Sequence, residues 1–82
     1  PTVSIRPTPA REMVWVEISI PHAQAAELEL RDALGSVVLA RQLGTIRGEH
    51  VETLDLSRLN GGIYFLSVRV DGREHIERIT HF

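Results

Sequence analysis

The chain contains no cysteine and no lysine, and it has few aromatic residues. The absence of cysteine excludes a disulfide framework and a thiolate metal site, so a hydrophobic core alone must hold the fold together. All nine basic residues are arginine. Codon bias explains this usage better than selection for arginine side chains that bind anions. The formal net charge of −2 and its even spread argue against a nucleic-acid surface and against a polybasic membrane anchor.

Long apolar runs are also missing. No stretch approaches the length of a membrane span, and no positively charged leader precedes an apolar segment. We therefore expect no membrane insertion. The 82 residues leave room for one domain. Because the chain begins at Pro1 rather than at Met, we expect it to be a piece of a longer polypeptide.

Enzymatic signatures are absent. The sequence contains no G-x-S-x-G elbow, no G-x-x-x-x-G-K phosphate loop and no H-E-x-x-H metal motif. His50, Asp55 and Ser57 lie close together in the sequence, but Asp55 and Ser57 are better explained as strand-end and turn residues that bond local backbone. We expect the domain not to be an enzyme.

Metal and glycan sites are the remaining chemical alternatives. His75, Glu77 and His81 alternate on one face of a predicted strand and could bind zinc together with His50 or His22. Exposed strand histidines are far commoner than ligands, and the acidic residues are too dispersed for a calcium cage. We therefore predict no metal and no cofactor.

Trp15 could stack on a sugar ring. A chain with four aromatic residues cannot supply an aromatic platform, so we expect Trp15 to cover one end of the core instead.

Alternating apolar and polar residues predict about seven short strands separated by turns. Proline-rich residues 1–11 predict a linker with a short edge strand at 3–6. The clearest strand runs over 12–20, and Pro21 is expected to end it. Residues 26–31 also alternate, although the local propensity of 23–33 is helical and a helix there is the competing interpretation. Further strands are expected at 36–43, 49–56 and 62–70, followed by one that continues to the chain end.

The stretch from Leu54 to Val70 predicts a corner between two sheets. Asn60, Gly61 and Gly62 tolerate a tight turn, and Tyr64 follows it where Greek-key sandwiches place a tyrosine that bonds nearby backbone. A plain hairpin through Asn60-Gly61 is the alternative, but it would leave Leu59 without a role. The fold class we predict is all-β, an Ig-like Greek-key β-sandwich of about seven short antiparallel strands over residues 3–82.

The last hairpin contains a conflict. Asp71-Gly72 favours a two-residue turn, but that register places Glu77 and His75 opposite Leu66 and Val68 on the core face. A loop one residue longer pairs apolar side chains instead. We predict the longer loop.

Four blocks of the chain resemble the type A C-terminal sorting domain of the type IX (Por) secretion system. They read P-T-P-A at 7–10, L-R-D-A-L-G-S-V-V at 30–38, L-G-T-I-R-G at 43–48 and T-L-D-L-S-R-L-N-G-G-I-Y-F-L-S-V at 53–68. The family's motif residues correspond to Pro7, Pro9, Asp32, Gly35, Gly48, Asp55, Leu56, Ser57, Leu59, Gly62 and Tyr64. The chain departs from the family at Thr8, at Arg6 and in its tail, where Arg78 is the one counterpart of a Lys-rich segment.

The resemblance implies that the domain acts as a targeting signal for secretion. Such domains end a cargo protein, here attached covalently upstream of Pro1, and are recognised by secretion-system proteins after passage into the periplasm. A sortase-like peptidase commonly removes them, and the cargo reaches the outer membrane surface or the extracellular space. An Ig-like binding or spacer module of an extracellular bacterial enzyme, possibly contacting glycans, is the alternative. Because the motif residues are mostly buried, we expect recognition on exposed turns or the last strand, at Asp32, Gly35, Asp71, Gly72 and Arg78.

Overall fold

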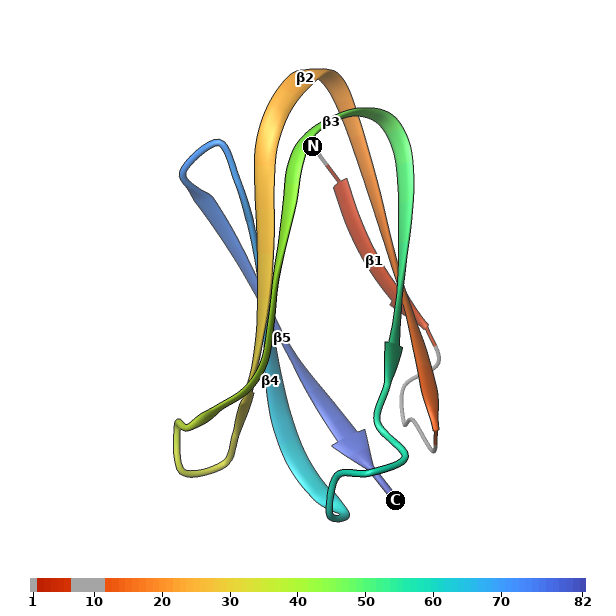
Figure 1. The fold of residues 1–82 in the computed structure, drawn as a ribbon, viewed down its shortest axis with the longest axis vertical. Coiled ribbons are helices and arrows are strands. Elements are labelled where there is room, and N and C mark those ends of the chain that lie inside the picture. The colour runs from red at the N-terminus through yellow and green to blue at the C-terminus, as the bar shows by residue number, and fades with distance from the viewer. Residues whose placement is uncertain (1, 7–11) are drawn as a thin grey trace.

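The structure is a computed structural model that describes residues 2–6 and 12–82. Within these residues it contains strands and no helix, so the interpretation of 26–31 as a strand is confirmed over the competing helix at 23–33. None of the described segments is a helix able to cross a membrane. The strands are β1 (Thr2–Arg6), β2 (Met13–Asp32), β3 (Val37–Asp55), β4 (Gly62–Val70) and β5 (Arg73–His81). All pairs are antiparallel, in the order β1-β2-β4-β5, with β3 also paired to β2 (Figure 1).

The prediction of seven short strands is wrong, because two pairs of them are continuous. Strand β2 continues past Pro21, and β3 includes residues 44–48, which separate the predicted strands at 36–43 and 49–56. The β2–β3 ladder shifts register between Ile20 and Gln24. Pro21 lies inside this irregularity, where its missing N–H costs no ladder hydrogen bond. The two strands therefore bend together instead of ending.

Gly48 lies at the same bend. Its φ is +76°, a conformation that a residue with a Cβ rarely adopts. It pairs with Ile20, the last residue of β2 before the register shift. The glycine thus allows β3 to follow β2 around the arch at the top of Figure 1.

The bend folds one sheet into two facing limbs (Figure 1). One limb contains β1 and the halves of β2 and β3 nearest to it, and the other contains the remaining halves with β4 and β5. The core fills the space between the limbs, with Val16 and Ile18 contributed by one and Leu28, Leu66 and Ile79 by the other, all at most 1% exposed. The strands form one sheet that is curled into a half-barrel, in which β2 and β3 pair on both sides of the bend. The predicted two-sheet Greek-key sandwich is therefore not confirmed.

The last hairpin adopts the register that we predicted it would avoid. Val70 pairs with Arg73 across a two-residue turn in which Asp71 and Gly72 have φ of +49° and +77°. A two-residue turn with these positive φ values matches the twist of the flanking strands. The turn therefore sets the register, although the longer loop would pair more apolar side chains. The strand tolerates this register because β5 is an edge. His75 there remains exposed, although Glu77 retains one buried carboxylate oxygen with no hydrogen-bond partner among the described residues.

A charged cluster joins the two halves of β3 across the bend. Arg41 donates from Nη1 to Oε2 of Glu52 and to the carbonyl of Thr53, each at 2.8 Å. His50 Nε2 lies 3.0 Å from the other Glu52 oxygen. The hydrogen bond with His50 and the contact with Arg41 hold the pKa of Glu52 below its ordinary value, against an opposing effect of burial. This cluster fastens the limbs on the side where β3 has no further strand partner among the described residues.

Candidate recognition surface

The corner after β3 has the tyrosine hydrogen bond that the sequence predicts. The Tyr64 hydroxyl donates to the carbonyl of Asn60 at 2.6 Å, and the residue is 6% exposed. Leu59 donates its N–H to the carbonyl of Leu56 at 2.9 Å and packs against the core. The plain hairpin is therefore wrong, because β3 and β4 do not pair and Leu59 has a packing role. The corner connects two limbs of one sheet and not two separate sheets as predicted.

The motif residues in this corner face inward or shape the backbone. Leu56 is fully buried, and its N–H bonds the carbonyl of Glu12 at 2.6 Å. His81, buried from β5, has its Nε2 3.1 Å from the carbonyl of Leu59, and its ring packs edge-on against Tyr64. The corner thus joins the start of β2, the end of β3 and the end of β5. Such residues specify the fold and offer little surface to a partner.

Asp32 closes the turn between β2 and β3. One of its carboxylate oxygens accepts the N–H groups of Leu34 and Ser36 at 3.0 and 2.9 Å. The Gly35 N–H bonds the Asp32 carbonyl at 3.0 Å, and Arg31 donates to the Gly35 carbonyl at 2.9 Å. The predicted turn is confirmed, and the Asp32 oxygen that makes these bonds serves its own backbone. Leu34 at the tip is 94% exposed.

The Asp71–Gly72 turn is fastened to the bend of β2. The N–H of Asp71 bonds the carbonyl of Ala25 at 3.1 Å, and Gln24 donates to its carboxylate at 3.3 Å. Asp32 pairs with Tyr64 at one end of β4, whereas Ala26 pairs with Val70 at the other.

The two turns therefore lie about 20 Å apart along the strand direction, one low and one high on the left side of Figure 1. The five predicted recognition residues do not form one patch. Arg78 lies in the row of Phe65, nearer the Asp32–Gly35 turn. Pro7 and Pro9 fall outside the described residues.

The solvent-facing side of β2, β4 and β5 carries an ordered set of side chains that we call the outer patch. Its members lie in three rows across the strands, Arg31–Phe65–Arg78, then Glu29–Ser67–Ile76, then Glu27–Arg69–Glu74. They alternate with buried residues of the same strands, such as Leu28 and Leu66, which fixes their outward direction. Part of this side forms a shallow depression of about 390 Å³.

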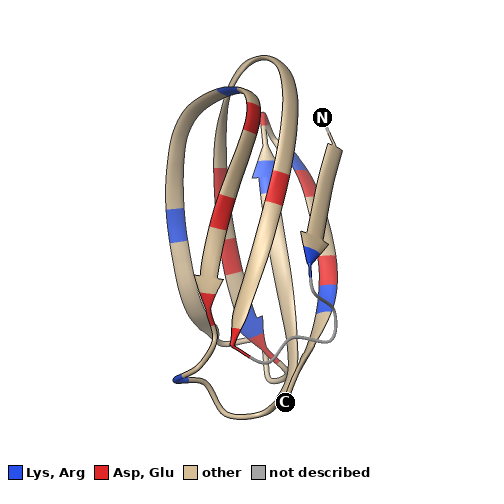
Figure 2. Ribbon diagram, turned by 90° about the vertical axis from the view of Figure 1, so that its right-hand side faces the viewer, with Lys and Arg blue, Asp and Glu red and all other residues tan. Residues whose placement is uncertain are grey.

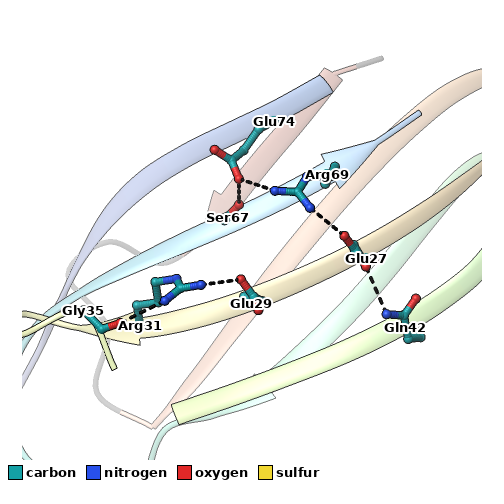
Figure 3. Close-up of polar contacts among 8 residues, drawn as sticks. All are labelled: Glu27, Glu29, Arg31, Gly35, Gln42, Ser67, Arg69 and Glu74. Carbon is teal, nitrogen blue, oxygen red and sulfur yellow. Dashed lines mark hydrogen bonds and ion pairs between the residues drawn. The ribbon is translucent and has the colours of Figure 1, made fainter. Parts of the chain in front are cut away.

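A chain of polar contacts crosses the third row (Figure 3). Arg69 donates to Glu27 and to Glu74, each at 3.0 Å, and Gln42 of β3 donates to the second oxygen of Glu27 at 3.0 Å. The Ser67 hydroxyl donates to Glu74 at 2.8 Å. Both bonds to Glu74 use Oε2, so no described residue bonds its Oε1, which can accept from a further donor.

These contacts fix the charges of the row. The hydrogen bond from Ser67, followed by the contact with Arg69, lowers the pKa of Glu74, and the pKa of Arg69 is raised chiefly by Glu74. Both groups are therefore ionised at neutral pH. Elsewhere, acidic and basic positions are interspersed along the strands (Figure 2).

The first row of the outer patch differs from the third. Phe65 lies between Arg31 and Arg78 and is 38% exposed, and Ile76 in the middle row is 58% exposed. Arg31 pairs with Glu29 at 3.1 Å, whereas Arg78 has no hydrogen bond or ion pair with any described residue. One end of the patch is therefore apolar and cationic, while the other is a compensated polar network.

The other candidate sites are not assembled. Asp55 accepts the backbone N–H of Ser57 at 2.9 Å, and its bonds to that serine lower its pKa. His50 instead contacts Glu52, so these side chains form no triad. The described part of the chain contains no group of three His, Asp or Glu side chains able to hold a metal ion.

Trp15 does not cover the core as predicted. It is 44% exposed on the outer side of its limb, between Arg6 and Thr53. The outward position follows from strict alternation with buried Val14 and Val16.

Sequence reasoning missed most of the outer patch. Strand periodicity shows that Phe65, Ser67 and Arg69 share a face, but it does not identify their neighbours on β2 and β5. The neighbours on β5 depend on the hairpin register, which we predicted wrongly. The turn chemistry of Asp71-Gly72 was the signal that could have found them.

Together, the curled antiparallel sheet, the tyrosine corner and the polar network on an open sheet face define a small all-β domain. The family model for the secretion system C-terminal sorting domain matches residues 4–80. The chain therefore belongs to this family, the C-terminal sorting domains of type IX secretion, and the resemblance drawn from the sequence is confirmed. Comparison with curated proteins finds no match to this chain.

Proposed function

We propose that this domain directs a covalently attached cargo protein, located upstream of Pro1, across the outer membrane by the type IX secretion system. The observation that carries the proposal is the family match over residues 4–80. The buried corner around Tyr64 agrees with it, because the motif residues there form one bonded unit. On this proposal the domain is a recognition element and not an enzyme.

The proposal includes a route and two kinds of partner. The domain passes through the periplasm, is recognised there by secretion-system proteins, and is removed by a sortase-like peptidase when the cargo reaches the cell surface or the extracellular space. We place the cleavage near Pro1, because the boundaries of domains are preferred sites of proteolysis.

We propose that the machinery reads the two exposed turns, Asp32–Gly35 and Asp71–Gly72. Hydrogen bonds within the Asp32–Gly35 turn hold its shape, and hydrogen bonds to Gln24 and Ala25 of β2 hold the Asp71–Gly72 turn. A preorganised loop loses little entropy on binding. We also propose that the two facing limbs are a variant of the Ig-like sandwich, in which continuous strands replace the links between two sheets.

An export assay tests the function. A reporter protein carrying residues 1–82 at its C-terminus is expressed in a bacterium that has a type IX secretion system, beside the reporter alone and the reporter with an established sorting domain. We expect the first and third proteins at the cell surface or in the medium. A reporter that stays in the periplasm with residues 1–82, while the established domain is exported, contradicts the proposal.

Removal of the domain is tested separately by mass spectrometry of the exported reporter. We expect the mature C-terminus to lie upstream of β1, and residues 2–82 to be lost as one piece. An exported reporter that retains the whole domain would refute removal without refuting the role in export.

A further inference from the structure

The outer patch has features that recognition through the turns does not use. Phe65 and Ile76 expose apolar surface, Arg78 has no partner among the described residues, and Glu74 has an open carboxylate oxygen. Exposed aromatic and arginine side chains are enriched in protein interfaces. An exposed apolar patch bordered by polar residues is typical of a surface that another protein covers.

The charges of the patch are arranged so that its first and third rows complement each other. Each strand carries, four residues apart, one member of each row. On β5 these are Arg78 and Glu74, and on β2 they are Arg31 and Glu27. On β4 they are Phe65 and Arg69, an aromatic ring and a cation that can attract each other. On every strand, the first-row side chain is thus one that the third-row side chain of the same strand could attract if the two faced each other.

From this pattern we infer that the outer patch binds a second copy of the same chain, face to face. The twofold axis of such a dimer would lie between the two sheets and run parallel to the middle row, across the strands. It would place each strand opposite the same strand of the second copy, running in the opposite direction. It would place Arg78 of one copy opposite Glu74 of the other, where the open Glu74 oxygen can accept its hydrogen bond. A closed dimer uses the same patch on both copies in this way.

The middle row lies on the axis, so each of its members faces its own equivalent. Ile76 then packs on Ile76 of the second copy, which buries the most exposed apolar side chain of the patch. Glu29 would meet a like charge, but Arg31 of its own chain already neutralises it at 3.1 Å. Sheets that pack face to face keep their strands within about 30°, which this arrangement allows.

The dimer would also change how the two turns are displayed. The axis exchanges the ends of the patch, so the Asp32–Gly35 turn of one copy would lie at the same end as the Asp71–Gly72 turn of the other. The turns lie about 20 Å apart along the strands of a single chain. This consequence rests on the proposed role of the turns, whereas the dimer itself does not.

Cross-linking tests the geometry, because the chain has no cysteine and a single one can be introduced. In the dimer, Cys at position 76 would face its equivalent across sheets about 10 Å apart, within reach of a short bismaleimide. We expect Ile76→Cys to form cross-linked dimers. Val51→Cys, which lies on β3 in the other limb and is 55% exposed against 58% for Ile76, is the matched control and should remain monomeric. Equal cross-linking of the two variants would overturn the inference.

Charge reversal tests the complementarity. The dissociation constant of the 82-residue chain is measured by analytical ultracentrifugation, with circular dichroism to verify folding. We expect Arg78→Glu and Glu74→Arg each to weaken association about tenfold or more, because like charges then meet. The combined variant should recover part of the loss, since the pair between the copies is restored with its signs exchanged, while Arg69 of the same chain then lies beside a like charge at position 74. Arg47→Glu, on the bend of β3, should have no effect.

The remaining outcomes are decisive too. A wild-type chain that stays monomeric at the highest soluble concentration overturns the inference. So does a dimer that is insensitive to Arg78→Glu, because it would then form elsewhere, for example along the open edge of β3 or by exchange of β5. The export assay is independent of these results, so either proposal can fail alone.

Discussion

Replacing Tyr64 with phenylalanine removes one oxygen atom from the corner and leaves the ring in place. The lost hydrogen bond is 2.6 Å long, and the residue that makes it is 6% exposed. Without it, the Asn60 carbonyl loses a partner at a site that water reaches poorly. We expect the free energy of unfolding to fall by about 1–3 kcal/mol. For a domain of this size, each 1 kcal/mol lowers the melting temperature by about 4–8 °C.

Urea denaturation followed by circular dichroism measures this loss, with the slope of the transition verifying that both variants unfold alike. Ser67→Ala is the matched control, because it also removes one hydroxyl and one hydrogen bond of 2.8 Å, but at the surface. We expect it to change stability by no more than about 0.5 kcal/mol. If Tyr64→Phe leaves the midpoint unchanged, or costs no more than the control, the corner is not fastened by the phenol and Tyr64 is ordinary core.

Two further predictions concern the bend. The pKa of Glu52 is lowered by His50 and Arg41, so its contribution to stability is complete above its ordinary pKa of 4.5 and is lost as the pH falls through the lower folded value. Between about pH 6 and about pH 3, the free energy of unfolding of Glu52→Gln should therefore fall less than that of the wild type, and the difference should be at most about 1 kcal/mol. A series of urea melts at different pH values measures this, and equal losses in the two proteins would contradict the prediction. Gly48→Ala should cost about 1–2 kcal/mol because its φ of +76° strains a residue with a Cβ. Thr45→Ala on the same bend should cost less than about 0.5 kcal/mol, and equal midpoints for the two variants would show that the bend is not strained.

The corner was predictable because its signals are local. A serine turn, an anchoring leucine, Asn60-Gly61-Gly62 and Tyr64 occur within one short stretch, and the hydrogen bond joins residues four apart. The Asp32 turn was predictable for the same reason, since the side chain bonds backbone two and four residues ahead. The outer patch was not, because its rows join β2, β4 and β5, and its partners on β5 change with a register shift of one residue.

Amino-acid sequence by itself determined the all-β class, the buried faces of the β2 and β4 segments, the tyrosine corner and the family. These follow from side-chain alternation and from short-range turn chemistry, which act within a few residues. Only the tertiary structure decided that Pro21 and Gly48 bend long strands instead of ending short ones, because a bend is stable only where paired strands curve together over a shared core. The same is true of the outer patch, in which residues far apart in the chain become neighbours through the hydrogen-bonded register of three strands.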